Sequence, residues 1–109
     1  MAKTEYILSY LPLFYEDLEK HAVYISEVLH NNDAANELLD AVELAIKERL
    51  PIAESFEEYK SKKERKYPYY RIYVKNYVIY YVVIPYKSGI KIMEVRRILH
   101  SLQNRDSII

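Results

Sequence analysis

The chain has 109 residues, of which 50% are hydrophobic, with a single glycine and no cysteine. This length supports one compact core rather than two, so we expect a single domain over residues 1–109. The lack of cysteine excludes disulfides and thiolate metal sites. Charges at Lys3 and Glu5 interrupt a signal-peptide core, and the longest apolar stretch, Tyr77 to Tyr86, is far shorter than the roughly 20 residues that span a bilayer. We therefore expect a soluble cytoplasmic protein.

The formal net charge of zero hides two oppositely charged halves. Residues 1–53 contain 4 basic and 10 acidic residues, whereas residues 54–109 contain 12 basic and 6 acidic residues. The first half therefore carries −6 and the second half +6. A basic face of the second half could bind an acidic partner or a phosphate backbone, and an equally good interpretation is that solvated helices are simply rich in glutamate.

The first half predicts a short strand followed by two amphipathic helices. Glu5 to Tyr10 is β-prone, and Pro12 favours the first turn of a helix that we expect to run to about His30. Its apolar stripe consists of Phe14, Leu18, Ala22, Ile25 and Leu29, and we expect Glu16, Asp17, Glu19, Lys20 and Glu27 to face water. Asn31 to Asp33 supplies a turn and an N-cap for a second helix that ends before Pro51. The apolar stripe of that helix consists of Ala35, Leu38, Leu39, Val42, Ile46 and Leu50.

The second half predicts a connector and three strands. Glu54 to Lys66 is nearly all charged, which indicates a mobile connector or a short surface helix. Tyr69 to Lys75 alternates in polarity as a half-buried strand does, with Asn76 in the following turn. Tyr77 to Ile84 is apolar on both faces, as expected for a central strand, and Pro85 to Gly89 is expected to form a longer hairpin loop. Ile90 to Leu99 returns as a third strand whose buried side the pattern leaves open.

The order of these elements predicts an α+β fold, β-α-α-β-β-β, in which a helical hairpin packs on one face of a small antiparallel-rich sheet. We expect the opposite face of the sheet to be free for a partner. Several segments then carry a family resemblance that spans nearly the whole chain. They are Ser9-Tyr10-Leu11-Pro12, Glu16-Asp17-Leu18, Tyr24-Ile25, Ala34-Ala35, Arg71-Ile72-Tyr73, Tyr77 to Tyr81, Arg97 to His100 and Arg105-Asp106. In this order and spacing they resemble the RelE/ParE toxin superfamily of bacterial type II toxin-antitoxin systems.

The resemblance implies a growth-inhibiting, plasmid-stabilising toxin that a small cognate antitoxin neutralises by wrapping around it, so that the two can form a hetero-oligomer. Two mechanisms share the fold, namely cleavage of mRNA in the ribosome by RelE-like members and binding of DNA gyrase by ParE-like members. In RelE-like members, clustered cations stabilise the scissile phosphate and a Tyr or His near the C-terminus moves protons. The cleaving members usually carry an Arg at the position of Val78, and here no Tyr follows His100. With a sequence pI of about 6.8, these departures favour the non-catalytic ParE-like branch.

Candidate site residues come from the basic half. If the protein is a nuclease, the candidates for catalysis are Arg71, Arg97 and His100. For binding of a target or an antitoxin, the candidates are Arg71, Tyr73, Lys75, Tyr80, Arg96, Arg97 and Arg105. Simpler roles stay open, since Arg71 can be a solvated strand residue, Arg97 can pair with Glu94, and His100 can be structural.

The strand region also holds eight of the 13 tyrosines. These rings could stack on nucleobases, but we favour a protein interface on the open sheet face. We expect no cofactor and no metal, because His21 has no second ligand at helical spacing. A third hypothesis is an inactive family member that only binds a partner.

Overall fold

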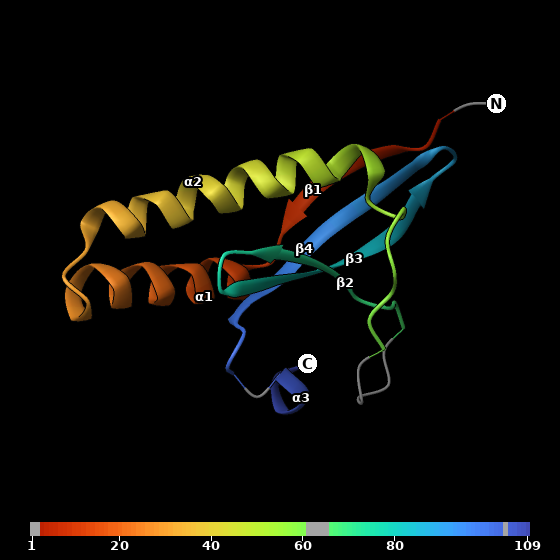
Figure 1. The fold of residues 1–109 in the computed structure, drawn as a ribbon. Coiled ribbons are helices and arrows are strands. Elements are labelled where there is room, and N and C mark those ends of the chain that lie inside the picture. Colours follow the sequence, from red (N-terminus) through yellow and green to blue (C-terminus); the bar gives the residue numbers. More distant parts are fainter. Residues whose placement is uncertain (1–2, 61–65, 104) are drawn as a thin grey trace.

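The computed structural model describes residues 3–60, 66–103 and 105–109. It contains four strands, two long helices and three short helical segments within this range (Figure 1). In chain order these are β1 (Glu5–Tyr10), α1 (Pro12–Val23), η1 (Tyr24–Val28), α2 (Asn32–Arg49), η2 (Leu50–Ile52), β2 (Tyr70–Val74), β3 (Tyr77–Lys87), β4 (Ile90–His100) and α3 (Arg105–Ile108). None of the helices in the described residues is long and apolar enough to cross a membrane.

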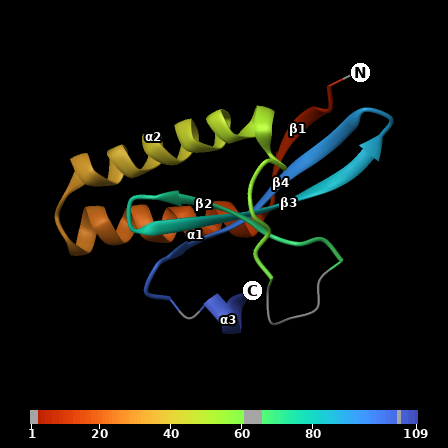
Figure 2. The ribbon, with the colours of Figure 1, turned by 45° about the vertical axis from the view of Figure 1, so that its right-hand side comes forward.

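The strands form one sheet in the order β1-β4-β3-β2. β1 pairs with β4 in parallel, whereas β2, β3 and β4 form an antiparallel meander. The hairpin of α1 and α2 covers one face of this sheet, which we call the hairpin face, and the opposite face is called the second face (Figure 2). The predicted α+β fold with a helical pair on an antiparallel-rich sheet is therefore confirmed.

The main core lies between the hairpin and the hairpin face. Phe14 from α1 and Leu38, Val42 and Ile46 from α2 are each at most 2% exposed. They pack on alternate residues of the strands, which are Tyr70, Ile72, Val74, Tyr77, Ile79, Tyr81, Val83, Met93, Val95 and Ile98. β3 is buried on both faces from Tyr77 to Val83, as its continuous apolar sequence predicts.

A β-bulge explains why the pattern of the last strand does not reveal its buried side. Tyr80 lies opposite Arg97 and Tyr81 lies opposite Val95, so that Arg96 is an extra residue without a partner on β3. The strand therefore changes parity, and Val95 and Ile98, three positions apart, both face the hairpin. A strict two-residue period cannot describe such a strand.

Side chains of α1 hydrogen-bond the edge of β4 beyond the point where β1 ends. β1 pairs with β4 as far as Tyr10 opposite Val95. Beyond that point, the backbone N–H of Ile98 donates to Asp17 Oδ2 over 3.2 Å, and the Ile98 carbonyl lies 2.8 Å from His21 Nε2, which must donate to it. Asp17 is 7% exposed, so the expectation that it faces water is wrong. The two side chains, four residues apart on α1, satisfy the edge of the strand that β1 leaves open.

The first predicted helix changes its geometry before its end. Regular α-helix stops at Val23, and a single π-helical turn, η1, follows from Tyr24 to Val28. The extra residue in this turn rotates the helix surface, so that Leu29 is exposed instead of continuing the predicted apolar stripe. In α2 the predicted cap is confirmed, because the Asn31 side chain accepts a hydrogen bond from the Ala34 N–H over 3.0 Å.

The connection between β3 and β4 is shorter than predicted. β3 continues through Pro85 to Lys87, and Gly89, with φ of 76°, lies in the tight turn that joins the two strands. The expected loop from Pro85 to Gly89 is therefore wrong. Pro85 and Tyr86 are tolerated in β3 because this end of the β3–β4 hairpin extends beyond the helices and its residues are exposed.

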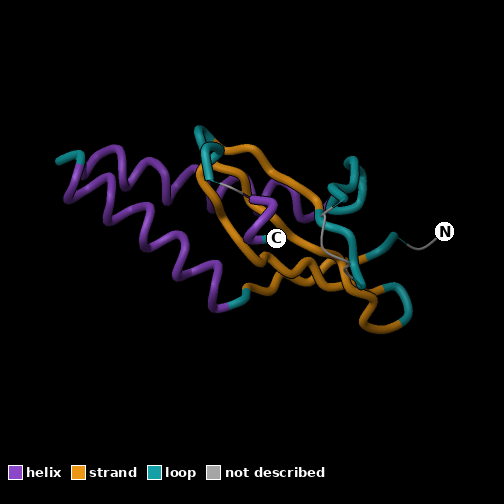
Figure 3. Tube along the Cα trace, turned by 90° about the horizontal axis from the view of Figure 1, so that it is seen from below, coloured by secondary structure: helices purple, strands orange, loops and turns teal. Residues whose placement is uncertain are grey.

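The second face of the sheet is covered rather than free, contrary to expectation. Tyr69, Val78, Tyr80, Val82 and Leu99 form a second core there with the C-terminal residue Ile109. The segment around Tyr59 pairs with Tyr69 in an isolated bridge, and α3 lies across the strands on this side (Figure 3). The described part of the connector, residues 54–60, is not helical, and residues 61–65 lie outside the described range.

Candidate partner-binding site

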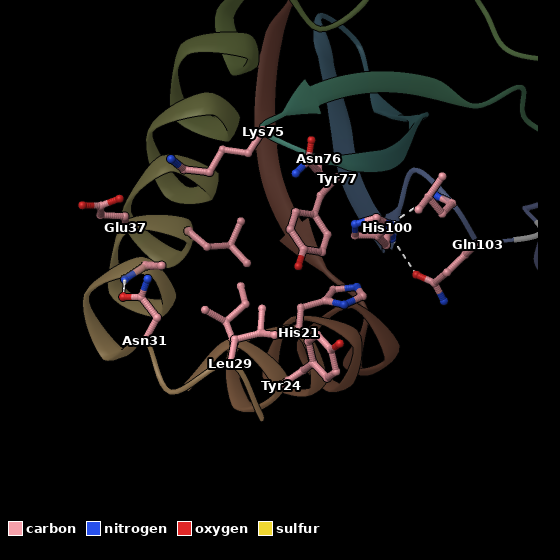
Figure 4. Close-up of a pocket in the computed structure, with 14 residues that line it drawn as sticks. His21, Tyr24, Leu29, Asn31, Glu37, Lys75, Asn76, Tyr77, His100 and Gln103 are labelled. Atoms are coloured by element: carbon pink, nitrogen blue, oxygen red, sulfur yellow. Dashed lines mark hydrogen bonds between the residues drawn. The ribbon is translucent and has the colours of Figure 1, made fainter. Parts of the chain in front are cut away.

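A groove opens between the tip of the hairpin and the end of the sheet, and we call it the tip groove (Figure 4). It has a volume of about 740 Å³. Its lining consists of His21, Tyr24, Ile25, Leu29, Asn31, Ala34, Glu37, Leu38, Lys75, Asn76, Tyr77, His100, Leu102 and Gln103. The helices supply most of the apolar wall, and the β2–β3 turn and the end of β4 supply most of the polar side. Such a largely apolar groove with a few polar groups at its rim is typical of a binding site.

Three rings form one wall of the tip groove. The Tyr77 ring centroid lies 4.6 Å from that of His21 and 5.1 Å from that of His100. His100 Nδ1 accepts a hydrogen bond from the Leu102 N–H over 3.1 Å, so its other ring nitrogen carries the proton in the neutral form. Burial raises the pKa of Tyr77, which keeps its hydroxyl protonated. The wall therefore presents aromatic surface to a bound group.

The rim of the tip groove exposes apolar side chains that a soluble monomer would normally bury. Leu29 is 56% exposed, Leu102 is 88% exposed and Tyr24 is 52% exposed. The same segment has two unusual backbone features, the π-helical turn η1 and His30 with φ of 53°. π-helical turns and non-glycine residues in the left-handed region are concentrated at functional sites. Exposed apolar side chains and unusual backbone geometry thus meet at the hairpin tip.

The structure distributes the candidate residues over both faces of the sheet. Lys75 and His100 line the tip groove on the hairpin face. Arg71 and Arg97 lie opposite Tyr80, whose side chain is part of the core of the second face. The three nuclease candidates, Arg71, Arg97 and His100, are consequently not brought together, because His100 faces the other side of the sheet.

Two of the candidate arginines are held in ion pairs. Arg97 donates to both oxygens of Asp17, over 2.7 and 2.8 Å, and this hydrogen bonding raises the pKa of Arg97. Arg96 donates to Glu94 over 2.8 Å. Burial alone would lower the pKa of Arg96, but the hydrogen bonds and charge interactions with Glu94 and Tyr69 together outweigh it, so that the pKa is raised. The proposed pair of Arg97 with Glu94 is therefore wrong, and the bulged neighbour Arg96 takes that partner.

The two candidate tyrosines differ in accessibility. Tyr80 is 1% exposed, so its ring cannot be a direct contact for a partner in this conformation. Its pKa is raised by burial, with Arg105 beside it acting in the opposite direction. Tyr73 is 66% exposed on the edge strand β2 and remains available.

Sequence reasoning missed two groups that the structure puts at these surfaces. Tyr24 and Leu29 line the tip groove, although the helical pattern assigns Leu29 to the core. Tyr59, from the charged connector, lies under the guanidinium groups of Arg71 and Arg105 on the second face. The only signal was that Phe56 and Tyr59 are aromatic residues in an otherwise charged segment.

Residues 8–105 match the family model described as the ParE toxin of the type II toxin-antitoxin system, parDE. A comparison with curated proteins gives no match. The matched range extends from β1 to the start of α3 and includes every residue of the tip groove.

Proposed function

Because the chain belongs to the ParE toxin family of type II toxin-antitoxin systems, we propose that it is a cytoplasmic, single-domain toxin that inhibits growth by binding a protein target such as DNA gyrase. A cognate antitoxin neutralises it, and the pair serves plasmid stabilisation. No catalytic step is assigned to the toxin, since its action rests on binding.

The separation of Arg71 from His100 carries the preference for binding over RNA cleavage. Phosphodiester cleavage requires cations and a proton-transfer group around one phosphate. Here Arg71 and His100 belong to opposite faces of the sheet, and Arg97 is engaged by a buried carboxylate. These three positions do not form a constellation of that kind.

The tip groove is the surface that we assign to the antitoxin. A largely apolar groove between the helical hairpin and the end of the sheet suits the apolar face of a partner helix, which would bury Leu29 and Tyr24. A test compares Leu29→Asp with Leu44→Asp, because Leu44 is 58% exposed on α2 but does not line the groove. Antitoxin copurification should fall at least tenfold for Leu29→Asp and stay unchanged for Leu44→Asp. Equal copurification of both variants would contradict the assignment.

The choice of target is tested by two readouts in parallel. Purified protein should inhibit supercoiling of DNA by gyrase and leave translated mRNA intact. The alternative, a RelE-like ribosome-dependent endoribonuclease, is supported by the gathering of Arg71, Arg96 and Arg105 on the second face. It predicts codon-linked cuts in mRNA that vanish in an Arg71→Ala, His100→Ala double variant. Induction in a bacterial host without any growth defect would support a partner-binding module without toxicity.

A further inference from the structure

Two arginines on the second face lie against one tyrosine ring. The guanidinium carbon of Arg71 lies 4.9 Å from the Tyr59 ring centroid, and that of Arg105 lies 5.3 Å from it. Neither arginine forms a salt bridge with another residue that the structure describes, whereas Arg96 and Arg97 do. We call Arg71, Arg105 and Tyr59 the arginine pair site.

Tyr59, which contacts both arginines, is itself held in place by backbone, ring and hydroxyl contacts. Its backbone N–H donates to the Tyr69 carbonyl over 2.6 Å. Its ring packs 5.8 Å from that of the buried Tyr80, and its hydroxyl donates to Asp106 over 3.3 Å. Contact with an aromatic face stabilises a guanidinium group without using its N–H donors on a carboxylate. Arg105 also hydrogen-bonds the Tyr59 and Tyr80 side chains, but each guanidinium group has five N–H donors, so both arginines keep donors for an incoming acceptor.

The spacing of the two cations limits what they can bind together. Since both lie close to one ring centroid, their guanidinium carbons are within about 10 Å of each other. In an extended peptide, side chains two residues apart point the same way and lie roughly 6 to 7 Å apart. Two carboxylates in an acid-x-acid arrangement can thus reach both guanidinium forks. Tyr73, beside Arg71, offers apolar surface to a neighbouring residue.

Nucleic acid fits this surface less well than an acidic peptide does. Recognition of single strands uses several exposed rings on which successive bases stack, whereas Tyr69 and Tyr80 are 4% and 1% exposed and only Tyr73 of these three rings is open. The chain also has no net charge to concentrate a polyanion around it. We propose that the arginine pair site binds an extended acidic segment of a partner protein through two carboxylates, one on Arg71 and one on Arg105. This inference rests on the geometry of the second face and is independent of the target proposed above.

Fluorescence anisotropy tests the proposal with a short labelled peptide that has a Glu-Leu-Glu centre between neutral residues. The full-length wild-type protein should bind it, and the matched Gln-Leu-Gln peptide should bind at least tenfold more weakly. The Arg71→Gln, Arg105→Gln variant should lose at least tenfold in affinity. The control is Lys47→Gln, Lys87→Gln, which removes the same charge at two exposed positions away from the site and should bind as the wild type does.

A second variant separates recognition from folding and from simple charge. Arg71→Lys, Arg105→Lys keeps both charges but loses the planar fork, so peptide affinity should still fall several-fold while the circular dichroism spectrum stays unchanged. Equal binding of the two peptides would overturn the proposal. So would an equal loss in the control variant, or tighter binding of a single-stranded RNA of similar length that depends on the same two arginines.

Discussion

Replacing Asp17 by alanine should destabilise the fold more than any surface change, because three interactions depend on this carboxylate. It accepts two hydrogen bonds from Arg97 and one from the Ile98 N–H. The Asp17 and Arg97 side chains are 9% and 21% exposed. Removing one partner of a buried pair costs about 3 to 5 kcal/mol, since the other charge stays buried without compensation. The orphaned Ile98 N–H belongs to the same loss, so we expect about 4 kcal/mol in total.

Urea unfolding at pH 7 measures this loss. With an m-value of about 1.5 kcal/mol/M for a domain of this size, the midpoint should fall by roughly 2 to 3 M. Glu43→Ala is the control, because Glu43 and its partner Lys47 are both more than 60% exposed and the midpoint should not move measurably. The Asp17→Ala, Arg97→Met double variant should recover part of the loss by removing the stranded charge. A midpoint shift below about 0.5 M for Asp17→Ala, equivalent to less than 1 kcal/mol, would refute the reasoning.

Three further predictions concern other parts of the fold. Burial alone would raise the pKa of Glu54, but hydrogen bonds from Lys91 and Tyr6 outweigh it and lower the pKa. The stability advantage of the wild type over Glu54→Gln should therefore be full at pH 7 and disappear as the pH falls through the pKa of this carboxyl group. Urea midpoints of both proteins between pH 7 and pH 3 measure this advantage, and a difference that does not depend on pH would disprove the prediction. Gly89→Ala should cost about 1 kcal/mol from backbone strain alone, because the φ of 76° disfavours a side chain while the space around it is open, and an unchanged melting temperature would speak against this. Leu38→Ala should lower the free energy of unfolding by about 2 to 5 kcal/mol, because it leaves a cavity under α2. Calorimetry should show a clearly lower melting temperature, and an unchanged melting temperature would place Leu38 outside the core.

The sequence predicts local periodicity well and long-range pairing poorly. The strand Glu5–Tyr10, the Asn31 cap and the end of α2 before Pro51 follow from nearby residues, and all three are confirmed. The helical pattern places Asp17 in solvent, whereas its partner Arg97 lies 80 positions away in the sequence. A helical pattern cannot reveal a buried ion pair whose other half belongs to a strand in the opposite half of the chain.

The candidate site shows the same division. Lys75 and His100 line the tip groove. The alternation along Tyr69 to Lys75 predicts that Lys75 shares a face with Arg71, which is wrong, because Lys75 lies in the turn after β2 with φ of 53° whereas Arg71 lies opposite Tyr80 on the second face. The π-helical turn η1 exposes Leu29. Because of the bulge at Arg96, it is Arg96 that pairs with Glu94, whereas Arg97 pairs with Asp17. Each device inserts one residue into a regular period, which shifts every later side chain to another face. The cover on the second face likewise depends on contacts of Tyr59 and Ile109 with distant strands.

A gyrase supercoiling assay with purified components tests the central claim most directly. Increasing concentrations of this protein should progressively inhibit ATP-dependent supercoiling of relaxed plasmid, and prior incubation with the cognate antitoxin should restore it. Full supercoiling activity at every toxin concentration, together with codon-linked mRNA cleavage in a translation reaction containing the same preparation, would contradict the claim that the protein acts by binding gyrase.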